Sequence, residues 1–196
     1  MIDISKIKKY LRQELSRKRY KHSINVSKMA VELAARYGCD LHKAEIAGLV
    51  HDCTREMSED IQLQYLKKMN CAADNVVINV KELMHAYSAV YVCSELFQVD
   101  DAEILAAVKY HTTGKADMSL LEKVIFLADF IEPERSFKGV DELRELAFRD
   151  LDLAVLKALN ISIEYVISKN RMLHPYTILA RNSIIGSMKK RLYNFE

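Results

Sequence analysis

The scarcity of glycine and proline is the sequence feature that most constrains how this chain can fold. Only five glycines and two prolines occur among its 196 residues, and these two residue types break helices most strongly. Between them, apolar residues recur at helical spacing, first at Ile4, Ile7, Leu11 and Leu15, then at Val26, Met29, Ala30 and Leu33. The sequence therefore predicts an all-α fold with short turns between helices.

Capping residues indicate where several of these helices begin and end. Gly38 is suited to end the second helix. Asp40, Ser58 and Ser119 are N-cap candidates, and Glu122 gives the last of them capping-box spacing. Further helical patterns lie near 82–97, 101–111, 119–132, 140–149, 151–170 and 176–193, with Pro175 in the first turn of the last. The run 75–80 could be strand-like, although no partner strand is evident.

The composition predicts one compact domain spanning residues 1–196. Half of the residues are apolar, and the formal net charge is only +2, so a large core is expected and a nucleic-acid partner is not. We expect a cytoplasmic protein without a membrane segment, because no stretch of about 18 uncharged apolar residues occurs. The cysteines form no CxxC pair, which suits a reducing compartment, and we interpret them as small buried residues. They are Cys39, Cys53, Cys71 and Cys93.

Ionisable side chains within apolar helical segments point to a buried site. A single buried histidine is more often a core residue with a satisfied hydrogen bond. Several such groups are costly to bury separately, so a shared site explains them better. Imidazole and carboxylate together suit iron, manganese, cobalt or zinc better than calcium or magnesium. The residues concerned are His22, His51, Asp52, His85, His111 and Asp129.

The order of these residues along the chain resembles a known superfamily. A histidine, a His-Asp pair and a distant aspartate on successive helices are the pattern of the HD-domain phosphohydrolases. The strings RYKHSINV, GLVHDCTREM, HAYSAV, KYHTTG, FLADFIEPER and LHPYTILARN are similar to its YqeK-type branch, over roughly residues 17–182. The resemblance implies a single HD-domain helical bundle that uses iron and hydrolyses diadenosine tetraphosphate symmetrically to two ADP molecules.

The same resemblance implies roles for individual residues. The implied metal ligands are His22, His51, Asp52 and Asp129. Asp52, His85 and His111 are the implied catalytic residues. The resemblance places around the phosphates Arg19, Arg55, His85, His111 and Arg135, and nearer the nucleoside Arg171, His174 and Tyr176. The implied substrate-binding set is completed by Asp52, Glu56, Met57, Ser58 and Asp129.

Several of these assignments have alternatives. The pair Arg55-Glu56 departs from the branch, where a lysine and another acidic residue are more usual, but an arginine also binds phosphate. His85 and His111 could hold a second metal ion, which leaves one ion or two. Arg19 shares a helix face with His22 but also belongs to the solvated basic run 17–21. The alternatives for Arg135 and Tyr176 are a surface salt bridge and packing on the core.

Other functions are also compatible with the sequence. One is another HD-type nucleotide phosphohydrolase or phosphodiesterase, such as a nucleotidase or an alarmone hydrolase. A second is an inactive module that senses a nucleotide, and a third is a helical scaffold. The enzyme interpretation is favoured because all the histidine and aspartate positions are present. A homodimer is plausible, but nothing in the sequence requires it.

Overall fold

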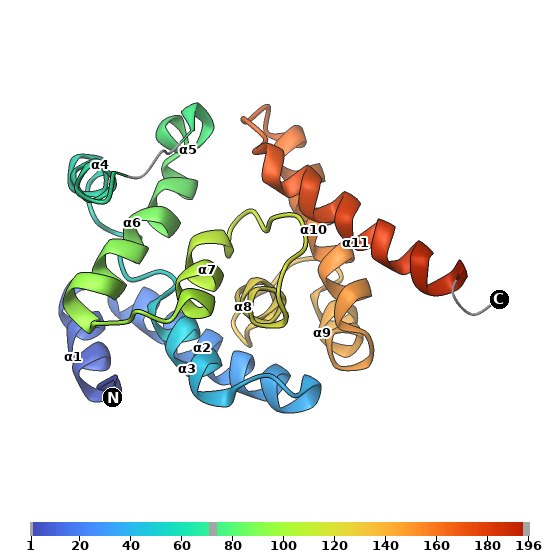
Figure 1. Cartoon of the computed structure of the whole chain (residues 1–196), viewed down its shortest axis with the longest axis horizontal. Coiled ribbons are helices and arrows are strands. Elements are labelled where there is room, and N and C mark those ends of the chain that lie inside the picture. The colour runs from blue at the N-terminus through green and yellow to red at the C-terminus, as the bar shows by residue number, and fades with distance from the viewer. Residues whose placement is uncertain (1, 71–73, 194–196) are drawn as a thin grey trace.

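The computed structural model describes residues 2–70 and 74–193, and its regular secondary structure there is entirely α-helical (Figure 1). This confirms the all-α prediction. Within those ranges it has eleven helices: α1 (Ile4–Glu14), α2 (Arg17–Tyr37), α3 (Leu41–Val50), α4 (Glu59–Lys68), α5 (Asn75–Asn79), α6 (Lys81–Phe97), α7 (Ala102–Tyr110), α8 (Leu120–Ile131), α9 (Val140–Arg149), α10 (Leu151–Ser168) and α11 (Pro175–Tyr193).

The helix ends follow the capping residues expected from the sequence. The Asp40 carboxylate accepts hydrogen bonds from the backbone N–H groups at the start of α3. Ser58 caps α4, and Ser119 forms a full capping box with Glu122 at the start of α8. Gly38 ends α2 with φ 74°, a left-handed conformation that glycine adopts without strain. These local signals are therefore sufficient to place an end of each of four helices.

The run 75–80 is where the local structure differs from the strand-like alternative. It forms the short helix α5, because the Asp74 carboxylate accepts hydrogen bonds from the N–H groups of Val76 and Val77. Val77 is buried against Met84 and Tyr87 of α6 in a small apolar cluster. The Asp74 cap and the burial of Val77 thus outweigh the preference of valine and isoleucine for strands. No strand that could pair with this run is present among the described residues.

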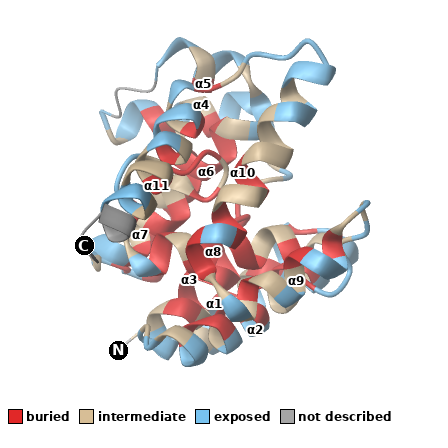
Figure 2. Cartoon of the chain, turned by 90° about the vertical axis from the view of Figure 1, so that its right-hand side faces the viewer, coloured by how far each residue is buried: buried red, intermediate tan, exposed pale blue. Residues whose placement is uncertain are grey.

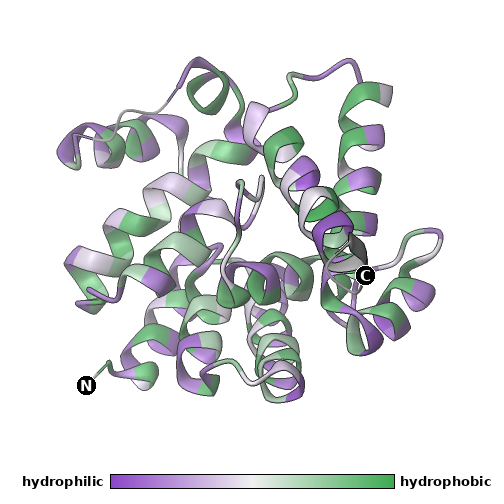
Figure 3. Cartoon of the chain, turned by 45° about the vertical axis from the view of Figure 1, so that its right-hand side comes forward, coloured by the Kyte–Doolittle hydropathy of each residue, from purple (hydrophilic) through white to green (hydrophobic). Residues whose placement is uncertain are grey.

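Apart from the small cluster around Val77, the core is one apolar cluster in which α8 is central. This helix contacts α2, α3, α7, α9 and α10, and its buried residues lie in the middle of the molecule in Figure 2. Apolar and polar residues alternate in bands along most helices (Figure 3), so one face of each helix packs inward. Cys53 and Cys93 are buried as predicted, Cys39 is only partly buried, and Cys71 lies outside the described residues.

The crossing of α2 and α3 is unusually close and determines the position of the polar site. A Cβ atom at Gly48 would lie 2.6 Å from the Cα atom of Ser27, so only glycine allows this approach. The crossing brings the side chain of His22 on α2 near His51 at the end of α3; their rings are 5.3 Å apart. Among the described residues no helix is long and apolar enough to cross a membrane.

Candidate metal centre and active site

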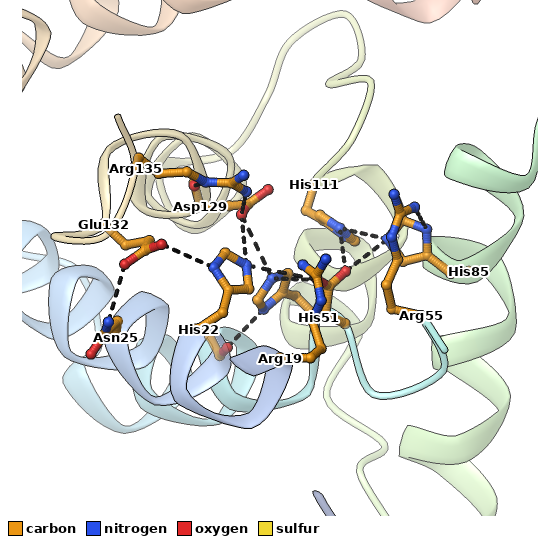
Figure 4. A network of polar contacts seen from close by, with 12 residues as sticks. Arg19, His22, Asn25, His51, Arg55, His85, His111, Asp129, Glu132 and Arg135 are labelled. Carbon is orange, nitrogen blue, oxygen red and sulfur yellow. Dashed lines mark hydrogen bonds and ion pairs between the residues drawn. The ribbon is translucent and has the colours of Figure 1, made fainter. Parts of the chain in front are cut away.

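Four side chains from α2, α8 and the end of α3 converge on one point inside the bundle (Figure 4). The His22 Nε2 atom lies 3.0 Å from an Asp129 carboxylate oxygen and 3.7 Å from an Asp52 oxygen. The His51 Nε2 atom lies 3.7 Å from Asp52 and 3.9 Å from Asp129. The four residues for which the sequence implied metal binding are therefore gathered around a common centre.

The hydrogen bonds of the imidazole rings leave nitrogen lone pairs facing this centre. His51 Nδ1 lies 2.8 Å from the Gly48 carbonyl oxygen, to which it must donate, so Nε2 of the neutral ring carries no proton. His111 donates in the same way from Nδ1 to the Val108 carbonyl, 2.7 Å away. The Nε2 atoms of His22 and His51 are buried without a hydrogen-bond partner. Orphaned lone pairs next to carboxylates are what a metal cation would satisfy.

The electrostatics of the centre agree with this donor set. Burial lowers the pKa of His51 to about 3, so its ring is neutral at physiological pH. Burial opposes ionisation of Asp52 and Asp129 as well, but neighbouring histidines and the Arg135 guanidinium hold both carboxyl pKa values well below their ordinary range. For His22 burial is outweighed by the close contact with the Asp129 carboxylate and by the charges of both aspartates, which raise its pKa.

Glu132 holds the other side of the His22 ring, a role that our sequence analysis missed. Its carboxylate is only 2 % exposed and lies 3.1 Å from His22 Nδ1, which donates to it. Its second oxygen accepts hydrogen bonds from Asn25 Nδ2 at 3.2 Å and from the Glu134 backbone N–H at 2.8 Å. A carboxylate behind a ligating histidine fixes its tautomer and makes it a stronger ligand. Three residues after Asp129, Glu132 is a further acid in an apolar segment, and that signal was available in the sequence.

Two arginines neutralise the carboxylates of the centre. Arg19 Nη1 donates to Asp52 at 2.7 Å, and Arg135 donates to the Asp129 carboxylate at 2.5 Å and to its backbone carbonyl at 2.8 Å. Both guanidinium groups border the centre and are not confined to solvated surface pairs. Arg144 of α9 fixes the turn that carries Arg135 by donating to the backbone carbonyl groups of Ile131, Glu132 and Arg135.

His85 enters from α6 with the opposite polarity to His51 and His111. Arg55 Nη1 lies 2.8 Å from His85 Nδ1, and because an arginine can only donate, this nitrogen is an acceptor. The proton of the neutral ring is therefore on Nε2, which faces Asp52 Oδ1 at 2.9 Å and His111 Nε2 at 3.1 Å. Burial lowers the pKa of His85 to about 4, so the neutral form dominates at pH 7.

The other predicted substrate-binding residues lie farther out. Glu56 accepts hydrogen bonds from the backbone N–H and the hydroxyl of Ser16, at 2.6 and 2.8 Å. Ser58 caps α4, and Met57 between them is partly buried. These contacts attach the loop after Asp52 to the start of α2. They leave the proposed substrate contacts of all three residues as predictions.

The three residues expected near the nucleoside lie in or next to the segment that leads into α11, which contacts Asp74 and the start of α6. Arg171 pairs with Glu82 at 3.1 Å, and the backbone carbonyl of Glu82 accepts from Arg55, also at 3.1 Å. His174 is buried, with Nε2 2.8 Å from Asp74 and its ring 4.8 Å from that of Tyr176. These interactions do not connect any of the three residues directly to the histidine–aspartate centre. Their contacts with a nucleoside stay predictions.

The helices of this bundle present buried histidines and aspartates to a common centre, and arginines border that centre. This arrangement defines the class of helical metal-site proteins. The chain is a member of the HD domain family, whose model matches residues 19–134.

Proteins similar to this chain are known in several bacteria. It is 35 % identical to a protein of Halalkalibacterium halodurans named "Bis(5'-nucleosyl)-tetraphosphatase, symmetrical", over 91 % of this chain and 95 % of that protein. It is 38 % identical to a protein of Bacillus subtilis with the same name, over 90 % and 94 %. A crystal structure from Clostridium acetobutylicum, described as a predicted HD superfamily hydrolase involved in NAD metabolism, is 42 % identical. It superposes with a TM-score of 0.92 over 95 % of this chain and 99 % of that one.

Proposed function

We propose that this protein hydrolyses diadenosine tetraphosphate symmetrically and releases two ADP molecules. The observation that carries the proposal is the buried centre of histidines and aspartates with Arg19, Arg55 and Arg135 around it. A polyphosphate needs this concentration of cations for its charge, and phosphoanhydride cleavage needs a placed water. Relatives that match about nine-tenths of the chain are named as symmetrical tetraphosphatases.

His22, His51, Asp52 and Asp129 are the proposed ligands of a divalent metal ion. The mixed nitrogen and oxygen donors suit iron, with manganese, cobalt and zinc as alternatives. When bound, the ion would neutralise phosphate charge and make a water more acidic. A single ion is supported by the polarity of His85, because its Nε2 atom carries a proton where a second ion would need a lone pair.

The protein's own groups perform the remaining steps. The guanidinium groups of Arg19 and Arg135 exchange their carboxylate partners for phosphate oxygens and hold the chain of phosphates in place. The Asp52 and Asp129 carboxylates, ionised at neutral pH, orient the attacking water. As the water oxygen bonds to phosphorus, the bond to the bridging oxygen breaks and that oxygen leaves with one ADP.

The leaving oxygen gains negative charge as this bond breaks, and a hydrogen-bond donor stabilises it. His85 is the proposed donor, because its Nε2–H points into the centre while Arg55 occupies its other nitrogen. His111 was predicted from the sequence to share this role. Its Nδ1 atom donates to the Val108 carbonyl, and its Nε2 atom lies 3.1 Å from His85 Nε2, so His85 is favoured as the donor.

Product analysis tests the proposal directly. Metal-loaded protein is incubated with diadenosine tetraphosphate and the nucleotides are separated by chromatography, beside chelated protein and the Asp52→Ala variant. We expect two ADP per substrate, and no turnover in either of these samples. Asp100→Ala, which removes an exposed aspartate away from the centre, should behave as wild type. ATP and AMP as products would contradict symmetrical cleavage, and turnover by chelated protein would contradict the metal assignment.

Cytoplasmic location, a homodimeric state and a single domain over residues 1–196 remain predictions. The cysteine pattern suits the first, since Cys53 and Cys93 are free thiols in the buried core. Gel filtration with light scattering would measure the second, and a single cooperative unfolding transition would support the third.

A further inference from the structure

A cavity of about 410 Å³ opens beside the histidine–aspartate centre. We call it the α2–α8 cavity, because its walls are the start of α2 and the loop that follows α8. Arg19, His22 and Arg135 line it, so its inner wall is the edge of the centre itself. Of the proposed metal ligands, His22 is the one that lines this cavity.

The centre has two sides that differ in their residues, and each side carries arginines. Figure 4 shows Arg135 on one side of His22 and His51, and Arg55 with His85 on the other. The α6 side continues outward through Glu82 to Arg171. The opposite side continues into the α2–α8 cavity, whose outer lining includes Lys18, Ser136 and Phe137.

The size and lining of the α2–α8 cavity suit a nucleotide. Its volume lies within the range of small-ligand pockets, about 300 to 1,000 Å³. Arg19 and Arg135 form the end near the centre, where phosphates would lie. Lys18 and Phe137 also line it, and the Phe137 ring is only partly buried and packs edge-on against Phe130, with 5.6 Å between ring centroids. A braced aromatic ring offers a surface on which a base can stack.

Three glutamates line the same cavity, and each already has a partner. Glu56 accepts hydrogen bonds from Ser16, Glu132 from His22, and Glu134 pairs with Lys21. Because these negative charges are engaged, they oppose a bound anion less than free carboxylates would. The arginines at the inner wall are paired with the proposed metal ligands, and a metal ion would compete with them for those carboxylates.

From this geometry we infer that the α2–α8 cavity holds one nucleoside diphosphate half of the substrate, while the α6 side holds the other half. The inference rests on the proposed function. A dinucleoside tetraphosphate cut at its middle bond has two equal halves, and each needs cations and a place for its nucleoside. Cations on both sides of the centre put the middle bond over the metal ligands, and this accounts for cleavage into two ADP in place of ATP and AMP.

Equilibrium binding of ADP tests the inference without turnover. Titration calorimetry of metal-loaded protein should find two ADP molecules per chain. In Phe137→Leu, which keeps an apolar side chain but removes the aromatic face, we expect one of the two to bind about tenfold or more weakly. Phe137→Tyr keeps an aromatic ring and should bind two ADP molecules as the wild type does. This result would show that Phe137→Leu weakens ADP binding through the loss of stacking and not through misfolding.

A pair of lysines on α2 provides a matched control for charge. Lys18 lines the cavity, whereas Lys28 is also exposed on α2 and does not. Lys18→Ala should weaken the same ADP as Phe137→Leu, and Lys28→Ala should weaken neither. With diadenosine tetraphosphate, Phe137→Leu should raise KM by about tenfold and change kcat little.

The outcomes separate this inference from the proposed function. One ADP per chain in the wild type, or two ADP sites that Phe137→Leu leaves unchanged, would overturn the inference even if the enzyme makes two ADP from its substrate. ATP and AMP as products would reject the symmetrical activity on which the inference depends. Two ADP sites, of which one responds to both Phe137→Leu and Lys18→Ala, would support it.

Discussion

Removing the Glu132 carboxylate should weaken metal binding although Glu132 is not itself a proposed ligand. Glu132→Gln keeps the shape of the side chain but removes the negative charge that faces His22 Nδ1 at 3.1 Å. Loss of such a carboxylate–histidine contact typically lowers metal affinity about 10- to 100-fold, which corresponds to about 1.4 to 2.7 kcal/mol. His22 would then be less strongly held in the tautomer that directs the Nε2 lone pair toward Asp52 and Asp129.

Folding must be separated from this effect, since Glu132 also accepts hydrogen bonds from Asn25 and from the Glu134 backbone. A glutamine can still accept from one of these donors, so metal-free Glu132→Gln should retain most of its stability. Glu132→Ala leaves buried donors without a partner, at a cost of about 1 to 3 kcal/mol for each. The glutamine variant therefore isolates the change in metal binding.

The assay is competition for manganese or ferrous iron between the protein and a chromophoric chelator, together with urea denaturation of the metal-free proteins. Glu134→Gln is the control, because Glu134 pairs with Lys21 and contacts no histidine of the centre. A metal dissociation constant for Glu132→Gln within twofold of wild type would refute the reasoning. An equal loss in Glu134→Gln would show that the effect depends on general charge and not on the His22 contact.

Two further predictions concern the metal-free protein. The pKa values of His51 and His85 are lowered by burial from 6.5 to about 3 and about 4, so below pH 6.5 the unfolded chain binds protons that the folded chain does not. As the pH is lowered from 6 to 4, the free energy of unfolding should therefore fall by about 1.4 kcal/mol per pH unit for each ring. Urea midpoints that stay constant across that interval would contradict this. Gly48→Ala should destabilise the fold by about 1 to 3 kcal/mol, because the new Cβ would meet Ser27, whereas Gly186→Ala has open space and should be neutral or stabilising. Thermal denaturation of the two variants would decide, and equal midpoints would rule out the close crossing as the cause.

The helices and the ionisable residues of the centre were predictable from local signals, whereas the metal-ligand roles came from the resemblance to the HD-domain phosphohydrolases. Spacing of apolar residues and caps such as Asp40 and Ser119 depend on interactions within one or two turns. The residues of the centre were recognisable because an ionisable group inside an apolar segment needs a partner, and His22 and Asp129 both lie in such segments. The run 75–80 was ambiguous because its apolar residues suit a strand as well as a helical turn.

Contacts between distant residues were not predictable in the same way. Glu132 lies 110 positions from His22 along the chain, and no local pattern records which buried carboxylate will face which ring. The polarity of His85 depends on Arg55, which approaches it from another segment. The α2–α8 cavity depends on the start of α2 and the loop after α8 lying beside each other, where Glu132 contacts His22 and Glu134 pairs with Lys21.

By itself, the sequence determined that the chain is helical, where most helices begin and end, and which six ionisable residues share a buried centre. Tertiary structure alone decided which nitrogen of each histidine faces that centre, which carboxylate stands behind His22, and that the centre has a second side. The physical reason is range: helix periodicity and capping act over a few residues, whereas hydrogen-bond polarity and cavity shape depend on how packed helices from distant parts of the chain meet.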